Sequence, residues 1–193
     1  MQDELIYEYP SSLEKIIHGT EALGFDMPSE PKTGALLKTL AASKANGTFL
    51  EIGTGTGLSA AWILKGMDKN STLTSLDNND KTQSVALEYL GDDPRFNVIC
   101  TDAGIWLEKN QDKRYDFIFA DALPGKFTHL QLALNILNVG GIYVIDDLLP
   151  QANWPEGHAP RVPELIDQIE KIPGFTSVRM EWASGLMLVV KTA

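Results

Sequence analysis

The sequence has almost no cysteine and no long apolar run. Cys100 is the only cysteine among 193 residues, so no intrachain disulfide can form, and we expect a reducing cytoplasmic compartment. No apolar run reaches the roughly 18 residues of a membrane-spanning helix. The acidic start, Met1-Gln2-Asp3-Glu4, lacks the basic and apolar regions of a signal peptide. We therefore expect a cytoplasmic protein with no membrane as a partner.

Basic residues are also scarce. The chain has 16 Lys and Arg against 26 Asp and Glu, which gives a net charge of −10 at pH 7. This balance disfavours nucleic acid or an anionic membrane as a partner, because both repel an acidic surface. The acidity does not by itself choose a substrate. The hydrophobic content of 44% is that of an ordinary globular protein, and the length suffices for one domain with its own core.

Residues 49–59, which read FLEIGTGTGLS, predict a strand, a glycine turn and the start of a helix. In this geometry a nucleotide-like cofactor lies against the backbone, with Gly53 allowing the tight turn and Gly55 and Gly57 allowing close approach of a ligand. The spacing G-x-G-x-G differs from the G-x-G-x-x-G of dinucleotide-binding enzymes. An acid, Glu51, also precedes the loop. These two details favour S-adenosylmethionine, a cationic sulfonium cofactor without a pyrophosphate.

Apolar runs alternate with amphipathic segments from residue 46 onward, which is the pattern of a parallel sheet with helices on both faces. We expect strands at 48–52, 71–76, 96–100, 115–120 and 141–145, and helices at about 58–66, 81–90, 104–109, 127–137 and 162–171. Two further helices precede them, at about 11–23 and 32–44. The segments 175–182 and 186–191 flank a short turn and predict an antiparallel hairpin. Residues 1–193 thus form one domain, with N-terminal helices (1–45) and a Rossmann-like core (46–193).

Four successive strands after the first are followed by acids. Asp77, Asp102, Asp121 and Asp146 each stand where a strand ends. The carboxyl ends of the strands in an open parallel sheet form one edge, and ligands bind there. Each acid alone has an ordinary interpretation as a helix N-cap, but the repetition indicates a binding site.

A long proline-containing loop, residues 150–163, follows the fifth strand and carries Trp154, His158 and Arg161. Its length and its position beside the acidic strand ends predict a lid that excludes water and contacts an acceptor. An ordinary surface loop is the alternative.

The chain resembles the small class I S-adenosylmethionine-dependent O-methyltransferases, the family of the catechol and caffeoyl-CoA O-methyltransferases. The resemblance covers roughly residues 31–191 and rests on four motifs: FLEIGTGTGLS (49–59), YDFIFAD (115–121), GGIYVIDD (140–147) and GLML (185–188). It implies a Rossmann-like, doubly wound α/β fold, with helices on both faces of a seven-stranded, mostly parallel sheet. The last strand is then inserted antiparallel, as part of a C-terminal antiparallel hairpin.

The resemblance also implies which residues bind the cofactor. Glu51 and the three glycines would line its methionine end, and Ser59 would donate to its carboxylate. Asp77 would bind the ribose hydroxyls, since one carboxylate can accept from two vicinal hydroxyls. The adenine would lie against Asp102 and Ala103. Asp121 would lie close to both the cofactor and the acceptor.

A divalent metal that holds two substrate oxygens is common in this family. Its ligands match Asp121, Asp146 and Asp147, and hard oxygen ligands suit Mg²⁺, Ca²⁺ or Mn²⁺. The chain departs from the family pattern in two places. Asp147 stands where the family usually has Asn, and Lys126 lies five residues after Asp121, where the family has a lysine at three. Lys126 and His158 are the candidate catalytic bases, and Lys126 or Arg161 could instead neutralise the acids without a metal.

Four functions remain open at the level of sequence. The leading one is metal-assisted O-methylation of a small hydroxylated acceptor. The others are a metal-independent N- or O-methyltransferase, an NAD-dependent oxidoreductase, and a cofactor-binding protein without catalysis. The chain has no Tyr-x-x-x-Lys pair, which disfavours the oxidoreductase. We also expect a homodimer, through the apolar stripe of the first helix or the terminal hairpin, although the stripe could equally be core.

Overall fold

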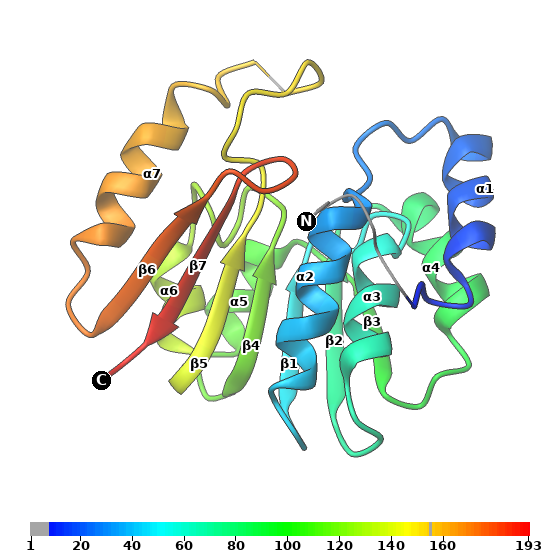
Figure 1. The fold of residues 1–193 in the computed structure, drawn as a ribbon, viewed down its shortest axis with the longest axis horizontal. Helices are drawn as coiled ribbons and strands as arrows, with labels where there is room; N and C mark the ends of the chain where they lie inside the picture. Colours follow the sequence, from blue (N-terminus) through cyan, green and yellow to red (C-terminus); the bar gives the residue numbers. More distant parts are fainter. Residues whose placement is uncertain (1–7, 155) are drawn as a thin grey trace.

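The computed structural model describes residues 8–154 and 156–193. Figure 1 shows one sheet with helices on both sides. The helices are α1 (Leu13–Leu23), α2 (Pro31–Ala42), α3 (Leu58–Gly66), α4 (Asp80–Leu90), α5 (Ala103–Lys109), α6 (Leu130–Asn135) and α7 (Arg161–Glu170). The strands are β1 (Thr48–Ile52), β2 (Thr72–Asp77), β3 (Phe96–Cys100), β4 (Tyr115–Ala120), β5 (Leu137–Ile145), β6 (Phe175–Met180) and β7 (Leu186–Lys191).

The sheet has the order β3-β2-β1-β4-β5-β7-β6. Strands β1 to β5 pair in parallel, whereas β7 is antiparallel to both of its neighbours, β5 and β6. From β1 the chain builds the sheet outward through β2 and β3, and it then crosses back to place β4 on the other side of β1. Ligands bind at such a switch point in open α/β sheets. The predicted doubly wound α/β fold and its inserted antiparallel strand are confirmed.

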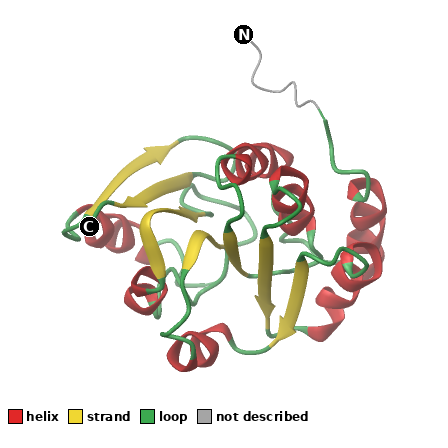
Figure 2. Cartoon of the chain, turned by 90° about the horizontal axis from the view of Figure 1, so that it is seen from below, coloured by secondary structure: helices red, strands yellow, loops and turns green. Residues whose placement is uncertain are grey.

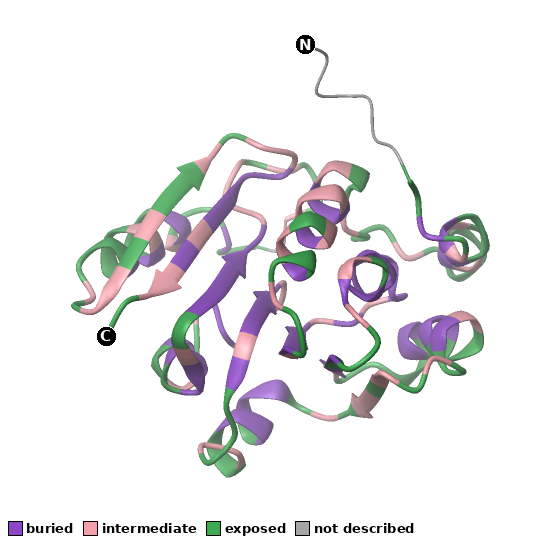
Figure 3. Cartoon of the chain, turned by 60° about the horizontal axis from the view of Figure 1, so that its bottom comes forward, coloured by how far each residue is buried: buried purple, intermediate pink, exposed green. Residues whose placement is uncertain are grey.

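Two hydrophobic cores lie on opposite faces of the sheet (Figure 2). Alternation along β4 separates them, because Phe117 and Phe119 pack with α1 to α4, while Ile118 and Ala120 pack with α5 to α7. The central strand β4 is therefore apolar at every position except Asp116, as expected for a strand covered on both faces. Figure 3 shows this burial along β4 and β5.

The N-terminal helices belong to the core of the domain. Leu13 and Ile16 of the apolar stripe of α1 are buried and join the core of α3 and α4, whereas Leu23 at the end of α1 is 46% exposed. Helix α2 packs on α3 so closely that a Cβ atom on Gly34 would lie 2.2 Å from the Trp62 ring. The linker between α1 and α2 therefore has a fixed course over the carboxyl ends of the strands.

Three expected elements differ most from the structure, while other bounds shift by one or two residues. The helix expected at 127–137 is reduced to α6, because the N–H groups of Phe127 and Thr128 both donate to the Leu123 carbonyl and hold a compact turn before it. Strand β5 begins at Leu137 instead of residue 141. Strand β6 ends at Met180, and beyond it the Trp182 indole N–H donates to the Lys32 carbonyl at 2.8 Å. None of the helices in the described part of the chain is long and apolar enough to cross a membrane.

Candidate active site

A cavity of about 390 Å³ opens at the carboxyl ends of the central strands. Segments far apart in the sequence line it. They are the α1–α2 linker, the glycine loop after β1, the ends of β2, β4 and β5, the loop that includes Trp154 and His158, and Ser184 in the β6–β7 turn. A second cavity of about 410 Å³ shares Gly53, Asp77 and Ala122 with the first. Together they form an elongated site across the switch point of the sheet.

The glycine loop has left-handed backbone at each glycine, with φ of +107° at Gly53, +51° at Gly55 and +92° at Gly57. A Cβ atom on Gly53 would lie 2.7 Å from the Asp121 carbonyl oxygen, and one on Gly57 would lie 2.7 Å from Ala86 Cβ. These two glycines therefore allow close packing of the loop on β4 and α4. Gly53 and Gly55 line the cavity but Gly57 does not, so the expected ligand approach at Gly57 is not observed.

Glu51 is fully buried and is not among the residues that line the cavity. The Ser75 hydroxyl donates to its Oε2, whereas Oε1 has no partner in the described structure. Burial raises the pKa of Glu51 to about 7, although hydrogen bonds from Ser59 and Ser75 oppose this shift. Ser59 is 2% exposed and does line the cavity. The structure thus places Ser59 in the wall and Glu51 behind it, because Glu51 points from β1 into the packed layer.

Asp77 ends β2 and belongs to both cavities. Its Oδ2 accepts from the Gly55 N–H at 2.8 Å and its Oδ1 accepts from the Asn79 N–H at 3.0 Å. Asp102 and Ala103 line the second cavity only. The Asp102 carboxylate also caps α5 by accepting from the Ile105 N–H at 2.9 Å. The two acids expected along one ligand therefore lie along the same elongated site, and both also stabilise the backbone.

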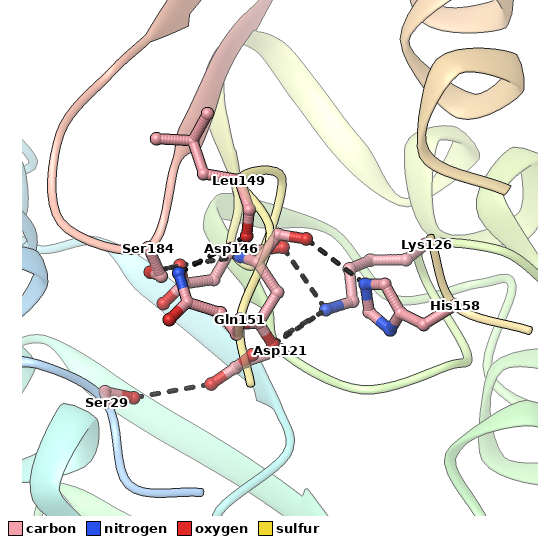
Figure 4. Close-up of polar contacts among 9 residues, drawn as sticks. Ser29, Asp121, Lys126, Asp146, Leu149, Gln151, His158 and Ser184 are labelled. Atoms are coloured by element: carbon pink, nitrogen blue, oxygen red, sulfur yellow. Dashed lines mark hydrogen bonds and ion pairs between the residues drawn. The ribbon is translucent and has the colours of Figure 1, made fainter. Parts of the chain in front are cut away.

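Asp121 and Asp146 lie beside Lys126 at the carboxyl ends of β4 and β5 (Figure 4). Asp147, the next residue, forms an ion pair with the same lysine. The Lys126 Nζ atom lies 3.7 Å from Asp121 Oδ1 and 3.5 Å from Asp147 Oδ2, and it donates to the Asp146 carbonyl oxygen at 3.2 Å. The Lys126 side chain is only 3% exposed. The acids expected to bind a metal are therefore brought together, but around an ammonium group.

Besides Lys126, other protein groups form hydrogen bonds or close contacts with these acids. Ser184 donates its hydroxyl to Asp146 Oδ1, which also accepts from the Asp147 N–H at 2.7 Å. Ser29 Oγ lies 3.4 Å from Asp121 Oδ2. Burial is the main cause that raises the pKa of Asp121 well above its usual value, followed by the charge of Asp146. Burial likewise raises the pKa of Asp146 to about 6, against the hydrogen bond from Ser184.

This donor set does not fit the predicted divalent metal. Such an ion needs several oxygens at about 2.0–2.6 Å, whereas a nitrogen cation lies within 3.2–3.7 Å of three oxygens here. Within residues 8–154 and 156–193, no group of three or more His, Cys, Asp or Glu side chains could hold a metal ion. The predicted metal site at Asp121, Asp146 and Asp147 therefore finds no support in the described residues, where the Lys126 ammonium group already lies among these acids.

His158 closes one side of the cavity. It is 6% exposed, and the Trp154 ring stacks on it with centroids 4.3 Å apart. Its Nε2 lies 3.2 Å from the Asp147 carbonyl oxygen, and since a carbonyl only accepts, Nε2 carries the hydrogen. Burial lowers the pKa of His158, so the imidazole is neutral at pH 7 with Nδ1 as an acceptor. Asn153 ties the loop to the α1–α2 linker by donating to the Asp26 carbonyl at 2.8 Å.

Two residues at the site were not predicted from the sequence. Ser29 and Ser184 stood out only as parts of a linker and a hairpin turn. The signal for Ser184 was indirect: a hairpin whose second strand pairs with β5 brings its turn to the same edge as Asp146. Lys126 was predicted as a candidate base, and the structure places it in the acidic cluster.

Comparisons with known proteins give one consistent result. A family model described as a methyltransferase domain matches residues 50–148. A protein of Mycolicibacterium vanbaalenii, provisionally named an O-methyltransferase, is 32% identical over 120 residues, which are 60% of this chain and 53% of that protein. A protein of Mycobacteroides abscessus with the same provisional name is 28% identical over 176 residues, or 85% of this chain and 81% of that protein. The chain thus spans about half the length of most of the curated relatives that it matches.

Solved structures share the fold at low sequence identity. An O-methyltransferase from Bacillus cereus in complex with SAH has a TM-score of 0.85 at 19% identity, covering 98% of this chain and 94% of that one. The O-methyltransferase TomG from Streptomyces achromogenes in complex with SAM has a TM-score of 0.78 at 19% identity, covering 99% and 94%. The family model covers half of the chain, including the glycine loop and all three clustered acids. The chain therefore belongs to the methyltransferase domain family.

Proposed function

We propose that the chain binds S-adenosylmethionine along the elongated site and methylates an oxygen of a small hydroxylated acceptor. The observation that carries this proposal is the pair of adjoining cavities that share Gly53 and Asp77. Their union runs from the acidic cluster to the start of α5. A long cofactor with a reactive group at one end and an adenosine at the other fits this shape.

The residues present fit such a cofactor on structural grounds. Left-handed glycines give the loop a backbone wall, and Asp77 lies where the two cavities meet. The Oε1 atom of Glu51 is buried behind this wall without a partner among the described residues, and a cation bound nearby would favour the charged form of this carboxyl. The Bacillus cereus and Streptomyces achromogenes structures contain SAH and SAM, which agrees with this assignment.

When bound, the cofactor supplies an electrophilic methyl group: the acceptor oxygen bonds to the methyl carbon, the carbon–sulfur bond breaks and its electron pair stays on sulfur. The chain must then take up the hydroxyl proton. Lys126 directs its N–H groups to three aspartates, whereas Nδ1 of His158 has no hydrogen-bond partner among the described residues. His158 is therefore the proposed general base.

The cavity lining favours an uncharged acceptor. Five acids line the main cavity, namely Glu30, Asp77, Asp121, Asp146 and Asp147. Among the described lysine and arginine residues, Lys126 alone lines this cavity. An acceptor with carboxylate or phosphate groups would be repelled at this short range. The aromatic wall of Trp154 and His158 suits a flat apolar ring. A small neutral molecule is thus a better partner than nucleic acid or an anionic membrane.

Calorimetry with S-adenosylmethionine, its demethylated product and NAD tests the cofactor, and an acceptor screen with labelled methyl donor tests the transfer. We expect the first two ligands to bind and NAD not to bind. Cofactor binding without any labelled product across neutral phenols, alcohols and amines would favour a non-catalytic binding protein. Labelled product only from amines would instead assign N-methylation.

A homodimer in the cytoplasm is a further part of this proposal. Leu13 and Ile16 of the α1 stripe are unavailable for dimer contacts, because they are core, and only its end at Leu23 is exposed. The edge strand β6, with Val178 52% exposed, is the remaining part of the predicted interface. Light scattering at micromolar concentration checks the oligomeric state.

A further inference from the structure

Lys126 owes its position to the loop between β4 and α6. The N–H groups of Lys126, Phe127 and Thr128 all point to the Leu123 carbonyl, at 3.3, 3.0 and 3.1 Å. This turn directs the Lys126 side chain inward, where 3% of it remains exposed. A lysine that was merely part of the surface would keep its ammonium group in water instead. The loop therefore builds a buried cation at this point.

Asp147 has an unusual backbone conformation that turns it toward this cation. It is a non-glycine residue with φ of +62°, a conformation that needs support from its surroundings. The Asp147 N–H donates to Asp146 Oδ1 at 2.7 Å, and the next N–H, of Leu148, donates to the Gly185 carbonyl at 3.0 Å. Two successive residues after a strand normally point in opposite directions. The left-handed turn at Asp147 brings both Asp146 and Asp147 into the cluster.

We propose that Lys126 is the resident cation of this site, holding Asp121 and Asp147 beside the acceptor in place of a divalent metal. This inference rests on the proposed function only for the statement that an acceptor binds beside these acids. The Lys126 Nζ lies 3.7 Å from Asp121 Oδ1 and 3.5 Å from Asp147 Oδ2, so one positive charge already faces both carboxylates. A divalent ion would have to displace this ammonium group, whose side chain is only 3% exposed.

The remaining contacts of the acids support the same assignment. Asp146 Oδ1 already accepts two hydrogen bonds, and Asp121 Oδ2 faces Ser29. These contacts hold the Asp121 and Asp146 carboxylates in place beside Lys126 (Figure 4). Lys126 is thus a positioning residue: its charge keeps two carboxylates together that would otherwise repel each other.

Titration of the wild-type protein with Mn²⁺, followed by electron paramagnetic resonance, tests the assignment without cofactor or acceptor. We expect no stoichiometric site at about 1 mM Mn²⁺, a concentration equal to the dissociation constants of the weakest protein sites for hard divalent ions. Lys126→Met keeps the aliphatic stem and removes the charge. It should gain one Mn²⁺ site, at least about tenfold tighter than any binding by the wild type, and Asp121→Asn added to it should remove that site.

Lys191→Met is the matched control, because Lys191 also donates to buried carbonyls, those of Leu134 and Leu137, away from the cluster. It should gain no site. A wild-type Mn²⁺ site that Asp121→Asn abolishes would overturn the proposal, even if Lys126→Met fails to fold. A folded Lys126→Met that gains no site would also overturn it. Binding of the demethylated cofactor, measured separately by calorimetry, reports on the proposed function and not on the cation.

Discussion

The carboxylate of Asp77 accepts a hydrogen bond from the Gly55 N–H at 2.8 Å, which connects the end of β2 to the glycine loop after β1. The same carboxylate lines both cavities. Asp77 thus has two tasks, to hold the loop and to face the ligand. Its second oxygen accepts from the Asn79 N–H, which fixes the plane of the carboxylate.

The first prediction separates these two tasks. Asp77→Ala should weaken binding of the demethylated cofactor by about 10-fold or more, or about 1.5–3 kcal/mol for lost hydrogen bonds to a charged group. Asp77→Asn keeps an oxygen that can accept from Gly55 but loses the charge. If Asp77 binds ribose hydroxyls, Asn should weaken binding nearly as much as Ala, as calorimetry will show. Unchanged affinity in both variants would remove Asp77 from the site.

The sequence predicted the positions of the strands better than the positions of the side chains at the site. Strands β1, β3, β4 and β7 have the expected bounds, because buried strands read as apolar runs that end at turn residues. The acids Asp77, Asp102, Asp121 and Asp146 were identifiable since parallel strands share one ligand-binding edge.

Three features at the site depend on contacts between distant residues. Burial of Lys126 follows from the turn around the Leu123 carbonyl. This turn includes the first residues of the helix expected at 127–137, which is shortened to α6. Ser184 reaches Asp146 because β7 pairs with β5. The left-handed turn at Asp147 carries no glycine to reveal it. These features arise from tertiary packing, which overrides local preference.

The second prediction concerns Trp154, whose ring stacks on His158 at the cavity wall. Trp154→Ala removes a flat apolar surface that would contact the acceptor, and it frees the His158 ring. We expect KM for the acceptor to rise, or kcat to fall, by about tenfold, since the contact corresponds to roughly 1.4 kcal/mol. Cofactor affinity should not change. Steady-state kinetics with an acceptor from the labelled-methyl screen measure this.

Trp154→Phe is the matched variant for this experiment, because it keeps an aromatic face and loses the indole N–H. That N–H is buried without a partner among the described residues, so Phe should retain most activity. Equal kinetics for wild type and Trp154→Ala would show that the loop is an ordinary surface loop and not a lid.

The third prediction tests the packing of α2 on α3. A Cβ atom on Gly34 would lie 2.2 Å from Cδ1 and 2.3 Å from Nε1 of Trp62, and Trp62 is 1% exposed in the core. Gly34→Ala should therefore lower the free energy of unfolding by about 1–3 kcal/mol, despite the better helix propensity of alanine. Urea denaturation measures the loss. If the variant is as stable as wild type, Gly34 does not lie in close contact with the Trp62 ring.

The last prediction concerns Glu51, a buried carboxyl whose pKa is raised to about 7 from 4.5 in the protein without ligand. The folded state then binds a proton more tightly than the unfolded state, so this group's contribution to stability is complete below pH 4.5. It is lost as the pH rises through about 7. At about 1.4 kcal/mol per pKa unit, the loss attributable to Glu51 is about 3 kcal/mol at most. Glu51→Gln stays neutral and should remove this part of the pH dependence.

Denaturant unfolding at pH 5 and pH 8 measures the effect as a difference between variant and wild type. This comparison cancels Asp121 and Asp146, which also have raised pKa values. Glu51→Gln should gain stability relative to wild type between pH 5 and pH 8, because only the wild type must expel a buried proton or bury a charge. Asp92→Asn, which changes an exposed acid, should show no such gain. If wild type and Glu51→Gln lose stability equally over this range, the carboxyl of Glu51 titrates normally, and its burial behind the glycine loop carries no electrostatic cost that a cationic ligand could relieve.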